Sequence, residues 1–142
     1  MSYLSQQDKN LIRWAVEARE RAYAPYSHFQ VGAALQTDEG AVYTGVNVEN
    51  CSYGLCMCAE RNAVAAAVRA GVRPGALQTV AVVADAASGL SPCGACRQVL
   101  REFGTDATRV VLHNLRDEHT RVVTLGELLP MPFTPDALPP TG

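Results

Sequence analysis

Three cysteines and one glutamate stand at spacings that suit a catalytic metal site. Cys58 precedes Glu60 by two residues, and Cys93 and Cys96 follow later in the chain as a C-x-x-C pair. Three thiolates can hold one zinc ion and leave its fourth coordination position open for water or substrate. If Glu60 is not itself a ligand, its carboxylate lies where it could move protons to and from zinc-bound water. The pattern predicts a catalytic centre with one zinc ion per subunit.

A closed, structural zinc site is the alternative for the same cysteines. Such a site needs a fourth ligand, which Cys56 could supply beside the three cysteines named above. A closed site would leave Glu60 without a role beside the metal, so we favour the open one. We therefore interpret Cys56, and Cys51 before it, as small buried thiols.

Three thiolates place much negative charge on a zinc ion, and the chain must offset it. Thiolates donate more charge than histidines do and should make bound water a weaker acid. Both cysteine segments are expected to begin helices, whose N-termini carry partial positive charge. Arg61, directly after Glu60, could add a guanidinium that hydrogen-bonds the thiolates. The alternative for Arg61 is an exposed position on a helix surface.

The elements that must position these residues can be predicted from hydrophobic periodicity and from turn residues. The expected helices are Ser5 to about Tyr23, Cys58 to about Ala70, Cys93–Phe103 and Leu125–Leu129. The expected strands are Phe29–Thr37, Val42–Val48, Leu77–Ala84, Thr108–Leu115 and Arg121–Thr124. We expect Pro25 to end the first helix and Asp38-Glu39-Gly40 to turn the first hairpin.

Strands that alternate with helices after an initial hairpin favour an α/β fold. We expect a single domain over residues 1–142, built as a three-layer sandwich with a mixed, mainly five-stranded sheet flanked by helices. The proline-rich end of the chain, residues 130–142, is expected to form a C-terminal tail. Leu77–Ala84, a continuous apolar run rich in valine, is expected to be a central strand.

Composition limits the partners of the chain. A net charge of −2 offers no positive surface for a phosphate backbone, so we expect no nucleic-acid partner. The longest apolar stretches, such as Ala63–Val68 and Val80–Ala84, are too short to span a bilayer. The N-terminal residues show no signal peptide, and the cysteines stand in metal-style pairs rather than in a disulfide framework. We expect a cytoplasmic protein that has no membrane contact.

Segments along nearly the entire chain resemble the small, homotetrameric class of zinc-dependent cytidine deaminases. The matching segments are Tyr23–Ser27, Phe29–Ala34, Asn47–Asn50, Cys58–Arg61 and Ser91–Gln98. The resemblance implies a cytidine deaminase-like fold and a homotetramer with sites shared between subunits. It implies hydrolysis of free cytidine and deoxycytidine to uridine and deoxyuridine plus ammonia, in pyrimidine salvage. Zinc-bound hydroxide would attack C4 of cytosine, while Glu60 would shuttle protons to N3 and to the leaving amine.

The resemblance also implies which residues bind the substrate. Asn47 and Glu49 would grip the ribose, and alternate positions at a strand end do point the same way. Phe29 would pack on the nucleoside, although an aromatic residue at the start of a strand is also typical of a core. Ala59 and Ser91 would contact the edge of the base.

Two further aromatic residues are implied to act between subunits. Tyr53 would reach the site of a neighbouring subunit, and Phe133 would close over the base from another subunit. Cys51 stands in the segment that carries Tyr53, where the family is expected to have alanine. This substitution bears on the contact between subunits and not on the chemistry.

Other functions stay open beside deamination of cytidine. A nucleoside-antibiotic deaminase or an RNA-editing deaminase would keep the chemistry and change the substrate. Asn47 together with Glu49 favours a free nucleoside, and the lack of a basic surface argues against polynucleotides. A non-catalytic interaction domain with structural zinc would tolerate Glu60→Gln but would unfold on loss of Cys58.

Overall fold

A mixed five-stranded sheet forms the middle of the protein, whose computed structural model describes residues 4–140. The strands are β1 (Val31–Thr37), β2 (Val42–Val46), β3 (Leu77–Ala84), β4 (Arg109–Asn114) and β5 (His119–Thr124). Their order across the sheet is β2-β1-β3-β4-β5. Only β3 and β4 pair in parallel, because α3 crosses over between them, and the other neighbours are antiparallel.

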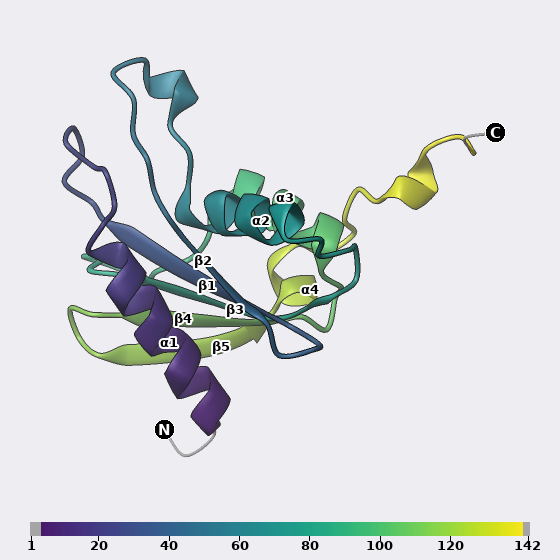
Figure 1. Ribbon diagram of the computed structural model, residues 1–142, viewed down its shortest axis with the longest axis horizontal. Coiled ribbons are helices and arrows are strands. Elements are labelled where there is room, and N and C mark those ends of the chain that lie inside the picture. Colours follow the sequence, from purple (N-terminus) through teal and green to yellow (C-terminus); the bar gives the residue numbers. More distant parts are fainter. Residues whose placement is uncertain (1–3, 141–142) are drawn as a thin grey trace.

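Helices cover both faces of the sheet (Figure 1). On one face lies α1 (Gln6–Arg19), and on the other lie α2 (Ala59–Arg69), α3 (Gly94–Phe103) and the short α4 (Leu125–Leu128). Two short 3-10 helices, η1 (Tyr53–Leu55) and η2 (Pro135–Ala137), complete the described elements. The expected three-layer α/β sandwich is confirmed.

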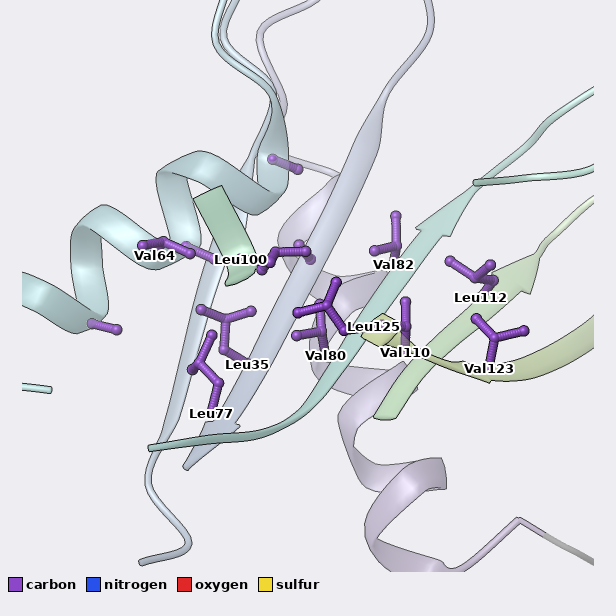
Figure 2. Close-up of a cluster of buried hydrophobic side chains, with 14 residues drawn as sticks. Leu35, Val64, Leu77, Val80, Val82, Leu100, Val110, Leu112, Val123 and Leu125 are labelled. Carbon is purple, nitrogen blue, oxygen red and sulfur yellow. The ribbon is translucent and has the colours of Figure 1, made fainter. Parts of the chain in front are cut away.

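The core has two parts because successive strand residues point to opposite faces of the sheet. Val80 and Val82 of β3 pack toward α2, α3 and α4, whereas Ala81 and Val83 pack toward α1. Figure 2 shows the larger part, in which Leu100 of α3 meets side chains of the sheet. Burial on both faces explains why β3 reads as an uninterrupted apolar run, as expected of a central strand.

A glycine in the sheet determines how closely α2 approaches it. A Cβ atom added at Gly45 of β2 would lie 2.3 Å from the backbone nitrogen of Ala63 and 2.5 Å from the carbonyl oxygen of Ala59. No side chain fits into that space without moving the helix. Because α2 begins beside Cys58 and carries Glu60, this contact helps to position the candidate metal site.

Several predicted boundaries differ from the observed ones. The second strand ends at Val46 rather than at Val48. The first helix ends at Arg19 rather than near Tyr23, because Tyr23 pairs through its backbone with Asn47 and Glu49. The first strand begins at Val31 rather than at Phe29, because the Asn47 side chain bonds the backbone before it. The last strand begins earlier than predicted, at His119, where it pairs with β4.

The length and the apolar character of a helix decide whether it could cross a membrane. Among residues 4–140, none of the helices combines the length and the apolar character that crossing a bilayer requires.

Candidate active site

Three cysteine sulfurs meet where two helices begin. Cys58 is the N-cap of α2, Cys93 is the N-cap of α3, and Cys96 lies in the first turn of α3. The Cys58 and Cys93 sulfurs are 3.9 Å apart, those of Cys93 and Cys96 are 3.4 Å apart, and all three lie within 4.8 Å of one another. A tetrahedral zinc ion with Zn–S bonds of about 2.3 Å separates its sulfurs by about 3.8 Å. The cluster could therefore hold one zinc ion.

Cys56 does not belong to this cluster. Among residues 4–140, the sulfur cluster contains only the three cysteines named above. The Cys56 sulfur instead accepts a hydrogen bond from the backbone N–H of Asn50 at 3.3 Å. The prediction of buried thiols is wrong for Cys51, which is exposed, and Cys56 is only half-buried. The reason is that the loop from β2 to α2, which carries η1, extends away from the sheet (Figure 1).

Arg61 lies against the sulfurs, as the sequence predicts. Its Nη2 donates a hydrogen bond to Cys58 Sγ at 3.4 Å, and its Nε is buried without a partner among the described residues. Hydrogen bonds from Cys96, Arg61 and Cys93 lower the pKa of Cys58 to about 5. The bond to the Cys58 thiolate is the main reason that the pKa of Cys96 is raised. A thiol with a lowered pKa is deprotonated more readily, and a thiolate is the form that binds a metal cation.

Glu60 lies beside the sulfurs in the first turn of α2, with only 4% of its surface exposed. Burial is the main reason that the pKa of Glu60 is raised, and the nearby Cys58 raises it further. A raised pKa makes a carboxylate a stronger base, which is better able to accept a proton from water. The position and the pKa of Glu60 therefore suit proton transfer.

Cys58, Cys93 and Glu60 line a cavity of about 290 Å³, whose walls include most of the residues that the sequence predicts for substrate binding. Those lining the cavity are Phe29, Asn47, Glu49, Ala59 and Ser91, together with Val31, Cys56, Met57, Cys58, Glu60, Val82, Leu90 and Cys93. Its walls are mainly apolar, with polar groups at a few positions, as in sites for small molecules.

Tyr53 and Phe133 do not line this cavity. Tyr53, with 73% of its surface exposed, lines an adjoining hollow that shares Glu49 and Cys56 with the cavity. Phe133 is 61% exposed and lies on the C-terminal segment, which leads away from the sheet (Figure 1). Its carbonyl oxygen accepts a hydrogen bond from Gln98 Nε2 at 2.9 Å.

The polar side chains of the cavity are already held by the protein. Asn47 Oδ1 accepts from the backbone N–H of Val31 at 2.9 Å, and Asn47 Nδ2 donates to the carbonyl of Phe29 at 2.8 Å. The Glu49 carboxylate accepts from the backbone N–H groups of Tyr26 and Ser27 and from the Ser27 hydroxyl. The Ser27 hydroxyl is the main reason that the pKa of Glu49 is lowered.

Sequence analysis missed two residues that support the cavity. Ser27 holds Glu49, and Arg97 donates hydrogen bonds to the Ser91 hydroxyl at 2.6 Å and to the Pro92 carbonyl at 2.8 Å. Both residues lie inside segments that carry the resemblance described above, which was the available signal. Their partners are distant in sequence or belong to a loop, so no periodic pattern reveals them.

Comparison with known proteins agrees with this site. The family model for the zinc-binding region of cytidine and deoxycytidylate deaminases matches residues 5–113. The cytidine deaminase of Halalkalibacterium halodurans is 50% identical over 124 residues, which cover 87% of this chain and 92% of that protein. The cytidine deaminase of Mycobacterium tuberculosis H37Rv is 46% identical over 133 residues, covering 93% and 94%.

Solved structures of cytidine deaminases are also similar to this chain. The crystal structure of cytidine deaminase from Burkholderia pseudomallei superimposes with a TM-score of 0.84 and 51% sequence identity, covering 92% of this chain and 100% of that chain. Residues 5–113, which the family model matches, contain the three cysteines and Glu60, so the zinc site agrees with the similarity in sequence. The chain belongs to the cytidine and deoxycytidylate deaminase family of zinc-dependent enzymes.

Proposed function

We propose that this enzyme hydrolyses free cytidine and deoxycytidine to uridine and deoxyuridine, with release of ammonia. The observation that carries the proposal is one cavity in which buried Glu60 and two cysteines of the three-thiol cluster, Cys58 and Cys93, lie among polar side chains suited to a sugar. Relatives named cytidine deaminase support the choice of substrate. Cytosine nucleosides are small enough to need only such a cavity, and the net charge of −2 offers no surface for a polynucleotide.

Each part of the chemistry has a residue in a suitable place. Zinc held by Cys58, Cys93 and Cys96 would act as a Lewis acid that makes water reactive at neutral pH. The Glu60 carboxylate would take a proton from the attacking water and deliver it to N3 of the base. It would then take the remaining proton from the hydroxyl group added at C4 and give it to the amine, which leaves as ammonia while the C4 carbonyl forms. Arg61 would stabilise the negative charge of the sulfurs through its hydrogen bond to Cys58.

The substrate would be held at both of its ends. We propose that the backbone N–H of Ala59 and Ser91 contact the edge of the base, and that Phe29 packs on the nucleoside. An amide nitrogen carries two protons, so Asn47 can donate a second hydrogen bond to a ribose hydroxyl while it holds Phe29. A carboxylate has about four acceptor sites, so Glu49 can also accept from the sugar.

We also propose that the enzyme is a cytoplasmic homotetramer of pyrimidine salvage whose subunits share their sites. Tyr53 and Phe133 are exposed aromatic residues on segments that extend from the sheet. Exposed aromatic side chains on projecting segments are typical of surfaces that pack against a partner. In the tetramer, Tyr53 and Phe133 would complete the cavities of neighbouring subunits.

The test follows the ultraviolet absorbance of cytidine and deoxycytidine with wild-type protein and with Glu60→Gln. Zinc content and circular dichroism are measured for both proteins. We expect conversion by the wild type and a fall in kcat of at least about 10²-fold in Glu60→Gln, because removal of a general acid–base group typically costs 10²–10⁴-fold. Glu102→Gln, an exposed glutamate on α3, is the matched control and should keep wild-type activity.

Two results would contradict the proposal. Wild-type turnover in Glu60→Gln would remove Glu60 from the chemistry and favour a structural zinc site. A folded, zinc-loaded wild type that converts neither nucleoside would overturn the substrate, and modified cytosine nucleosides would then be assayed.

A further inference from the structure

The loop before β1 is tied to Glu49 through one serine. The hydroxyl of Ser27 donates a hydrogen bond to Glu49 Oε2 and accepts one from the backbone N–H of Phe29 at 3.0 Å. The backbone N–H groups of Ser27 and Tyr26 donate to Glu49 Oε1 at 3.1 and 3.0 Å. A hydroxyl has one proton to donate and two lone pairs, so Ser27 can serve both partners at once.

The backbone of Phe29 is held on both sides by side chains. Ser27 binds its N–H, and Asn47 Nδ2 binds its carbonyl oxygen at 2.8 Å. His28, which lies between Ser27 and Phe29 in the chain, adopts a left-handed backbone conformation with φ of 59°. Residues other than glycine rarely adopt this conformation. A loop in this conformation needs outside bonds to persist, and the bonds to Ser27 and Asn47 supply them.

Ser27 itself lies behind the substrate cavity. Phe29, Asn47 and Glu49 line the cavity, whereas Ser27 lines the adjoining hollow with Tyr53. Ser27 can therefore affect a ligand in the cavity only through the residues that it holds. Of these, Glu49 has the longer and more flexible side chain, which would lose rotamer freedom each time it bound a ligand if nothing restrained it.

We propose that Ser27 is a positioning residue whose hydroxyl fixes the carboxylate of Glu49 and the turn before Phe29. By doing so it makes the enzyme select nucleosides that carry ribose hydroxyls. The inference rests on the proposed function, because it assumes that Glu49 binds the sugar. A site built to bond a hydroxyl discriminates well only when its polar groups are held in place.

The test measures binding and turnover separately. Affinities for cytidine and for 2′,3′-dideoxycytidine are measured by calorimetry in the inactive Glu60→Gln protein, with and without Ser27→Ala. We expect the cytidine Kd to rise about 10-fold, as for loss of one hydrogen bond to a charged group. The dideoxycytidine Kd should change little, so the preference for cytidine shrinks. In the active enzyme, Ser27→Ala should raise KM more than it lowers kcat.

Further variants make the test specific. Ser27→Thr keeps the hydroxyl and should restore most of the affinity, which a purely structural role of the loop would not require. Ser88→Ala removes an exposed serine before α3 and should leave every value unchanged. In a Glu49→Gln background, Ser27→Ala should have little further effect if it acts through the carboxylate. Should Ser27→Ala fail to fold, Ser27→Cys, which has a weaker donor, takes its place.

The outcomes distinguish this inference from the proposed function. Unchanged cytidine affinity in Ser27→Ala, or an equal loss for both nucleosides, overturns the positioning role while deamination of cytidine stands. A wild type that does not convert cytidine overturns the proposed function, whatever the variants bind. Lack of nucleoside binding by the Glu60→Gln protein overturns the positioning role as well.

Discussion

Single residues in this protein act through the groups that hold them, and Glu49 is an example. The hydrogen bond from the Ser27 hydroxyl does most to lower the pKa of Glu49, and the backbone of Ser27 and Tyr26 and the nearby His28 lower it further. A lowered pKa keeps the carboxylate ionised in mildly acidic solution. Binding of the sugar should therefore persist until the pH falls through that pKa.

The pH dependence of KM tests this relationship. For the wild type, the KM for cytidine should rise only below the ordinary pKa of a glutamate, 4.5. In Ser27→Ala the pKa of Glu49 returns toward its ordinary value, so the rise should begin at a higher pH. Steady-state kinetics across the acid limb measure both curves, with Ser88→Ala as the matched control. Curves with the same midpoint would show that Ser27 does not control the charge of Glu49.

At the scale of elements, the approach of α2 to β2 positions the metal site. A Cβ atom at Gly45 would lie 2.3 Å from the backbone of Ala63, and backbone atoms cannot turn aside as a side chain can. Since α2 starts at Cys58, a shift of the helix would separate Cys58 from the cysteines of α3. The packing of one glycine against the first turn of α2 should therefore affect metal binding at Cys58, which precedes that turn.

Gly45→Ala should lower both the free energy of unfolding and the zinc content. Overpacking costs about 1–3 kcal/mol in typical cores, and we expect about 3 kcal/mol here because the clash is with backbone. Urea unfolding and metal analysis of the purified variant measure the two effects. Gly89→Ala, at a glycine with open space around it, is the matched control and should change neither. Full zinc content with wild-type stability in Gly45→Ala would show that α2 is not positioned by this contact.

The sequence predicts the helices and strands better than it predicts the contacts that support the site. The apolar run Leu77–Ala84 predicts β3 to the residue, because a strand buried on both faces must be apolar throughout. The helix starts at Cys58 and Cys93 are also predicted, since thiol ligands and helix caps coincide there. The end of α1 and the role of Ser27 depend on contacts between segments about 20 residues apart. Such contacts leave no periodic signal, so the sequence alone does not reveal them.

At the scale of the whole molecule, one ion pair joins the first helix to the sheet. Both oxygens of Asp8 in α1 accept hydrogen bonds from Arg109 of β4, at 2.8 and 2.9 Å, although the two residues are far apart in the chain. Asp8 is only 2% exposed. Burial alone would raise the pKa of Asp8, but hydrogen bonds from Arg109 and from Ser5 outweigh it and lower the pKa below its ordinary value of 3.8.

The sign of this shift predicts how the pair contributes to stability as the pH changes. A lowered pKa in the folded state stabilises the protein above the pKa of the unfolded chain, and the contribution is lost as the pH falls through the folded value. Asp8→Asn should therefore lower the free energy of unfolding at pH 7 by about 2 kcal/mol, less than for a fully buried pair because Arg109 is partly exposed. The difference from wild type should shrink once the pH falls below 3.8, the ordinary value for Asp8.

Urea unfolding at one protein concentration, followed by circular dichroism at both pH values, measures the contribution of this pair. Asp85→Asn provides the comparison, because Asp85 forms an ion pair with Arg116 at 2.7 Å in which both side chains are about half exposed. Exposed pairs contribute about 0–1 kcal/mol, so Asp85→Asn should change stability little at either pH. An equal loss of stability in the two variants would mean that burial of Asp8 adds nothing to the contribution of its ion pair. A loss in Asp8→Asn that persists in acid would assign the effect to packing of α1 rather than to charge.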